Sequence, residues 1–98
     1  MAYLVVLTIE LDRTTPSIPS IVERQLNDLG LYKTLVGTKK TPSSLPANTF
    51  AGEFTGSAVN KVRDDMTDSI VSVLVRNQVH SKLLITVGGD WGWATRTT

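Results

Sequence analysis

Two carboxylates at the end of an apolar segment are the first candidates for chemistry. Glu10 and Asp12 are two residues apart, so both would project from one face if the strand that carries them continued. Carboxylate oxygens placed in this way can bind a hard cation such as Mg²⁺. The alternative is that both residues are polar groups that end a strand and enter a loop, because no third ligand is evident. We keep both as candidate catalytic residues and assign no metal-binding residue.

The single histidine, His80, is the third candidate catalytic residue. Its charge changes near neutral pH, so it could act as a general base or contact a phosphate. The alternative is an exposed surface residue at the start of a strand. The sequence has no Gly-x-Ser-x-Gly elbow. It also has no cysteine, which excludes disulfides and cysteine nucleophiles. No specific catalytic motif is therefore present.

Two further groups of residues could bind a partner. Arg13, Lys39 and Lys40 could contact a phosphate backbone, or they could be solvated loop residues. Trp91 and Trp93 could stack on bases. Large aromatic rings more often anchor a tail or a subunit interface, and we favour an interface for both tryptophans.

The composition limits what kind of protein can carry these residues. The chain has 98 residues, 41% hydrophobic and 19% charged, so we expect one domain over residues 1–98 with a real core. The net charge of +1 gives no strongly basic field, so a nucleic-acid surface would need local clustering. No signal peptide and no segment of transmembrane length is evident. We therefore expect a cytoplasmic protein without a membrane partner.

The apolar segment Ala2–Leu11 is rich in β-branched residues and is predicted to be the central strand of a sheet. A helix starts near Ser20, whose spacing to Glu23 is that of a capping box, and stops at Gly30. The remaining expected elements are a strand over 31–36, a loop over 38–47 that could overhang the sheet as a hairpin connection, a strand over 48–55, a helix capped by Ser57, and a strand over 80–87. This order predicts an α+β fold, a ferredoxin-like βαββαβ sandwich with a four-stranded antiparallel sheet and two helices on one face.

The predicted topology also indicates which residues should meet. The first strand should run antiparallel to the third and fourth, so its end lies beside their starts and beside the end of the second strand. Five candidate residues should therefore gather at one rim of the sheet, namely Asp12, Arg13, Lys39, Lys40 and His80. The core should bury Leu7, Ile9, Leu26, Met66, Ile70 and Leu84.

The segments Met1–Val5 and Lys82–Trp91, together with the two-helix layout, resemble the small SinR-like proteins. These are relatives of the second CRISPR-associated adaptation protein and, more distantly, of the VapD toxins. The resemblance implies a homodimer of ferredoxin-like units, with the segment after the last strand pairing across the dimer. It also implies a nucleic-acid-binding role or a Mg²⁺-dependent nuclease. In that family an aspartate ends the first strand. The matching positions here are Leu7 and Thr8, and a threonine hydroxyl cannot replace a charged ligand.

Two functional hypotheses remain open. The favoured one is a small non-catalytic homodimer, without a cofactor, that binds nucleic acid or a protein partner and uses its tail, residues 90–98, at the dimer interface. The alternative is a Mg²⁺-dependent endonuclease or endoribonuclease that uses Glu10 or Asp12, with Mg²⁺ as its cofactor.

Overall fold

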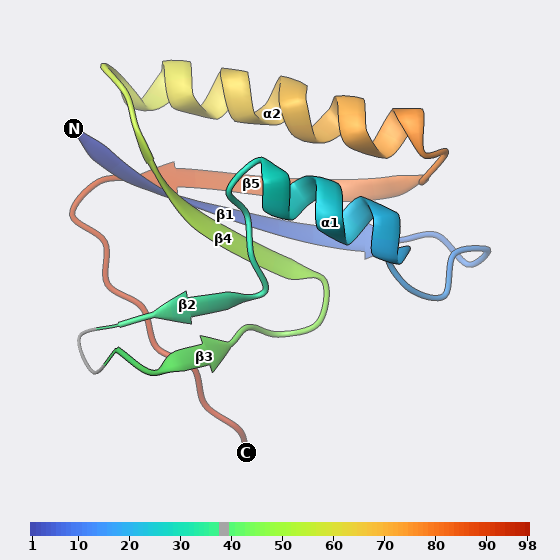
Figure 1. The fold of residues 1–98 in the computed structure, drawn as a ribbon, viewed down its shortest axis with the longest axis horizontal. Helices are drawn as coiled ribbons and strands as arrows, with labels where there is room; N and C mark the ends of the chain where they lie inside the picture. Colours follow the sequence, from blue (N-terminus) through green and yellow to red (C-terminus); the bar gives the residue numbers. More distant parts are fainter. Residues whose placement is uncertain (38–39) are drawn as a thin grey trace.

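The computed structural model describes residues 1–37 and 40–98 and contains two helices and two small sheets within them (Figure 1). In chain order the elements are β1 (Ala2–Leu11), α1 (Ser20–Asp28), β2 (Thr34–Val36), β3 (Pro42–Ser44), β4 (Thr49–Thr55), α2 (Val59–Arg76) and β5 (Ser81–Gly88). Among the residues that the structure describes, no helix is long and apolar enough to span a membrane.

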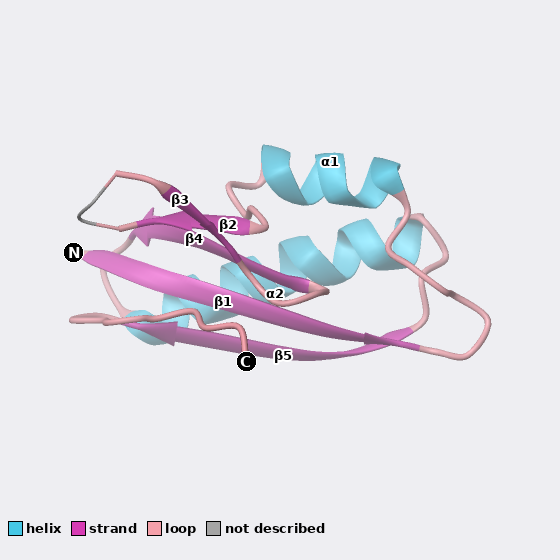
Figure 2. Ribbon diagram, turned by 90° about the horizontal axis from the view of Figure 1, so that it is seen from below, coloured by secondary structure: helices cyan, strands magenta, loops and turns pink. Residues whose placement is uncertain are grey.

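The larger sheet has three antiparallel strands in the order β4-β1-β5, so β1 is its central strand as predicted. Val5, for example, pairs with Gly52 of β4 on one side and with Val87 of β5 on the other. Both helices cover one face of this sheet, and the other face carries no helix (Figures 1 and 2). We call this second side the helix-free face.

Four strands were predicted to form one sheet, and this prediction is wrong. Tyr32 reaches β4 through a single bridge, in which its N–H donates to the Ala51 carbonyl at 2.9 Å. The chain then bends at Lys33, and β2 pairs with β3 instead of with β4. The Lys33 carbonyl accepts a hydrogen bond of 2.8 Å from the Leu45 N–H. Backbone groups of residues 33–36 thus form hydrogen bonds within the β2–β3 hairpin. In the predicted sheet these groups would have bonded to β4.

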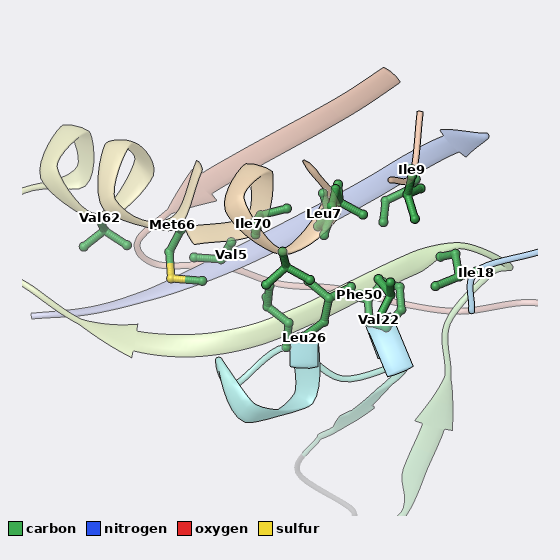
Figure 3. Packing of buried hydrophobic residues seen from close by; sticks show 14 of the residues in the cluster. Val5, Leu7, Ile9, Ile18, Val22, Leu26, Phe50, Val62, Met66 and Ile70 are labelled. Carbon is green, nitrogen blue, oxygen red and sulfur yellow. The ribbon is translucent and has the colours of Figure 1, made fainter. Parts of the chain in front are cut away.

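The core lies between the sheet and the helices. Figure 3 shows Leu26 of α1 and Ile70 of α2 close to Leu7 and Phe50 of the sheet, and none of the four is exposed. The five predicted core residues other than Leu84 are buried, as expected: Leu7, Ile9, Leu26, Met66 and Ile70.

Leu84 was predicted to be buried, but it is 64% exposed. Strand side chains alternate between faces, and Leu83 and Ile85 of β5 pack against the core. Leu84 therefore points to the helix-free face together with Thr86. The run of consecutive apolar residues in β5 hid this alternation in the sequence.

The predicted start of α1 near Ser20 and its predicted stop are confirmed, whereas the two predicted capping residues are wrong. Neither Ser20 nor Ser57 caps a helix, since α1 and α2 begin after Pro19 and Ala58 without a side-chain capping hydrogen bond. At the end of α1, Gly30 has a φ of 99°, which glycine adopts without steric cost. The Leu31 N–H donates to the Leu26 carbonyl at 3.0 Å and closes the turn.

Candidate functional site

The end of β1 holds the two predicted carboxylates in different environments. The Asp12 carboxylate accepts hydrogen bonds from the Thr14 hydroxyl at 2.8 Å and from the Thr14 N–H at 3.1 Å. The side-chain hydrogen bond from Thr14, followed by that from Thr15, lowers the pKa of Asp12 below its ordinary value. Asp12 thus lies just after the end of β1 and accepts hydrogen bonds within the turn that follows.

Glu10 instead lies within the sheet, where it pairs with Lys82 of β5. Both are exposed and border a shallow hollow of about 200 Å³ on the helix-free face. His80 is exposed beside them, and its carbonyl accepts the Asp12 N–H at 3.3 Å. Across residues 1–37 and 40–98, no three acidic or histidine side chains are close enough to hold a metal ion. The Mg²⁺-dependent nuclease stays a prediction.

The predicted basic rim is divided between two ends of the molecule. Arg13 lies in the loop that follows β1, whereas Lys40 lies at the turn between β2 and β3, and Lys39 falls outside the described residues. The loop after β1 and the adjoining ends of β2 and β3, next to Lys40, lie at opposite ends of β1 (Figure 1). The expectation that Arg13 and Lys40 share a rim is therefore wrong, because the bend at Lys33 reverses the direction of β2. Their individual contacts with phosphate stay a prediction.

A large hollow lies on the helix-free face, between the sheet, the β2–β3 hairpin and the C-terminal tail. We call it the tail cleft, and its volume is about 890 Å³. Its lining includes Leu4, Val6 and Ala51 from the sheet, Leu35, Leu45 and Pro46 from the hairpin and the chain that follows it, and residues 93–98 from the tail. Figure 2 shows the tail running back from the end of β5 across this face.

Trp93 lies against the hairpin of its own chain, and Trp91 borders a hollow beside it. A Cβ atom added to Gly37 would lie 3.3 Å from Cζ2 of Trp93, so the indole packs directly on the backbone there. Trp91 and Trp93 are both half-buried, and both border a second hollow of about 660 Å³ with Thr41 and Ser43. Each ring thus keeps an exposed portion beside a hollow. Their predicted role at a subunit interface stays a prediction.

The tail cleft is almost free of charge. Among its described lining residues, Arg96 has the one charged side chain, and its guanidinium donates to the neighbouring Thr95 carbonyl at 2.8 Å. The cleft can therefore cover apolar groups and offer backbone or hydroxyl hydrogen bonds, but it offers few cations to a polyanion.

Sequence reasoning missed this cleft. The sequence offers only weak evidence for the cleft, because β2 and β3, which form its hairpin wall, have three residues each. In addition, Leu4 and Val6 of its floor are alternate residues of β1, where nearly every residue is apolar. Searches against protein-family models and against curated proteins find no match to this chain.

Proposed function

We propose that this chain is a non-catalytic binding module of variant ferredoxin-like fold that works as a homodimer. The antiparallel order β4-β1-β5 and the two helices on one face support the ferredoxin-like assignment. In this proposal the hairpin formed by β2 and β3 stands where the fourth strand of that fold would lie. The proposed likeness to SinR-like proteins rests on the opening strand and on the segment Lys82–Trp91.

The tail cleft is the single observation that carries the binding function, and it favours a protein partner over nucleic acid. Its floor of Leu4, Val6 and Ala51 is aliphatic, and half-buried Trp93 stands at its side. Aromatic side chains with an exposed portion are frequent anchors at protein interfaces. A nucleic acid would instead need several cations along its backbone, and the cleft supplies Arg96. An extended peptide segment with apolar side chains fits this lining best.

A selection with phage-displayed random heptapeptides on the full chain tests the proposal. We expect enriched sequences with alternating apolar side chains, and synthetic peptides of those sequences should change the tryptophan fluorescence on binding. Trp93→Ala should weaken binding at least about tenfold, as the loss of an interface anchor does. The matched control is Val75→Ala, since Val75 is 68% exposed on α2 and lies outside the cleft.

Two outcomes would contradict the proposal. One is the absence of any enriched peptide, or peptide binding that Trp93→Ala leaves unchanged. The other is binding of single-stranded oligo(dT) or oligo(U) in place of peptides, with an affinity that falls linearly with salt on a log–log scale. That result would move the function to nucleic acid.

A further inference from the structure

β5 is the outermost strand on its side of the sheet, and its free edge presents a regular row of backbone groups. The Asp12 N–H donates to the His80 carbonyl at 3.3 Å, which fixes the alternation of the β1–β5 ladder. In an antiparallel pair, residues whose N–H and C=O face the neighbour alternate with residues whose groups face away. Ser81, Leu83, Ile85 and Val87 therefore direct their N–H and C=O groups outward.

The edge of β5 lacks the devices that usually prevent strands from pairing. Proline and inward-pointing charges normally interrupt such edges. Between Ser81 and Gly88 there is no proline, and the one charged residue is Lys82 at the start. The tail turns away after β5 and crosses under the sheet, so it does not run along this edge (Figure 2).

Apolar side chains flank the edge on both sides. On the helix side, Ile85 and Val87 are only partly buried. On α2, which packs on β5, Val71 is 41% exposed and lies on the side of the helix opposite Arg76, whose guanidinium reaches Gln25 of α1. On the helix-free side, Leu84 is 64% exposed. Pairing at this edge would therefore cover apolar surface on both faces of the sheet.

We propose that a second copy of this chain pairs along β5, antiparallel, with the two-fold axis at Leu84. In this register Ser81 pairs with Val87 of the second copy, and Leu83 pairs with Ile85 of the second copy. Every outward-facing N–H and C=O of β5 then has a partner. The result is one continuous six-stranded sheet made from two three-stranded sheets.

The side chains of β5 favour this register. They also make the edge complementary to itself, which favours a second copy of the chain as the partner. Lys82 lies opposite Thr86 of the second copy, so no like charges face each other. Leu84 lies opposite its own symmetry mate, which covers the most exposed apolar side chain of β5. A two-fold axis at Lys82 would bring two ammonium groups together. One at Thr86 would leave the outward groups of Ser81 without a partner strand.

This inference rests on the proposed homodimer and names its interface, and a single cysteine tests it, since the chain has none of its own. At the two-fold axis the Cα atoms of Leu84 and its mate should lie about 4.5 Å apart, which a disulfide can bridge. Leu84→Cys should form a covalent dimer under mild oxidation. Thr86→Cys, exposed on the same face, is the matched control, because its mate would lie about 13 Å away. It should remain a free thiol.

The second test is the mass of the intact chain by analytical ultracentrifugation over the micromolar range. We expect a dimer that Leu84→Lys converts to a monomer with an unchanged circular-dichroism spectrum, whereas Val36→Lys, at an exposed valine of the hairpin, leaves it intact. A monomeric wild-type chain would overturn both the interface and the proposed homodimer. A dimer that tolerates Leu84→Lys and leaves Leu84→Cys unlinked would overturn the β5 interface alone. If deletion of residues 90–98 then converts that dimer to a monomer, the tail forms the dimer interface.

Discussion

Replacement of Gly52 by alanine should destabilise the fold strongly, because β4 and the end of α1 touch at this glycine. A Cβ atom at Gly52 would overlap the carbonyl oxygen of Gly30. That oxygen is backbone, and it is held in place because the Gly30 N–H donates to the Asn27 carbonyl at 2.9 Å. The neighbouring Leu31 N–H is bonded in the same turn. No flexible side chain can move aside, so α1 itself must shift from the sheet.

The size of the effect follows from two opposing terms. Overpacking typically costs about 1–3 kcal/mol, and a clash with backbone belongs at the upper end of that range. Alanine restricts the unfolded chain and offsets about 0.4–1 kcal/mol of this. We therefore expect Gly52→Ala to lower the free energy of unfolding by about 2–3 kcal/mol. The group that makes the close approach over Gly52 is the Gly30 carbonyl.

Urea unfolding, followed by circular dichroism, measures this difference. The matched control is Gly88→Ala, the same change in another strand, where no atom lies within 4 Å of the added Cβ. It should be neutral or slightly stabilising, by up to about 1 kcal/mol. A Gly52→Ala protein that unfolds within about 0.5 kcal/mol of the wild type would refute the close packing of α1 on β4.

Three further predictions concern the core, a helix end and a turn. Ile70→Ala should lower the free energy of unfolding by about 2–5 kcal/mol, and Leu84→Ala should lower it by less than about 1 kcal/mol. Both are measured by urea unfolding at a concentration where the chain is monomeric. Equal effects would refute the assignment of Ile70 to the core and of Leu84 to the helix-free face. Gln78 has a φ of 57° after α2, so Gln78→Gly should raise the thermal midpoint, and a lower midpoint would contradict that geometry. The lowered pKa of Asp12 means that its carboxylate stabilises the fold above its ordinary value of 3.8 and loses that effect as the pH falls through the lowered pKa. Thr14→Ala should raise this pKa in a carboxyl carbon NMR titration, and an unchanged pKa would show that the hydroxyl is not the cause.

Local sequence signals identified the elements that have long, regular patterns. β1 was recognisable because ten residues with few polar groups and many β-branched side chains are typical of a strand covered on both faces. The stripe through Met66 and Ile70 likewise fixed the buried face of α2. Helix caps were less predictable than the start of α1 near Ser20, since a serine at the right spacing from Glu23 only permits a capping hydrogen bond. The backbone enters α1 through Pro19 instead.

The candidate site could not be predicted from the sequence, because it depends on where the chain bends. The residues from Leu31 to Val36 resemble a strand in composition, and Tyr32 does pair with β4. After the bend at Lys33 the hairpin leaves the sheet edge, and the Lys33 ammonium lies 3.4 Å from the Glu23 carboxylate of α1. Both side chains are well exposed, so this ion pair alone does not set the bend. The bend has no local signature in the sequence, yet the hairpin that follows it separates Lys40 from Arg13 and lines the tail cleft.

The proposed peptide site and the proposed dimer interface lie on different parts of the same sheet, so both can be occupied at once. The tail cleft lies toward β4 and the hairpin, whereas the free edge of β5 lies on the other side of β1. Pairing at Leu84 would therefore leave both clefts of a dimer accessible. A two-fold dimer would present two such clefts on one continuous helix-free face, so a partner with two apolar segments would bind with higher avidity than either segment alone. A dimer formed through Trp91 and Trp93 would instead cover the clefts. The mass of Leu84→Lys and the peptide affinity of Trp93→Ala together distinguish these two arrangements.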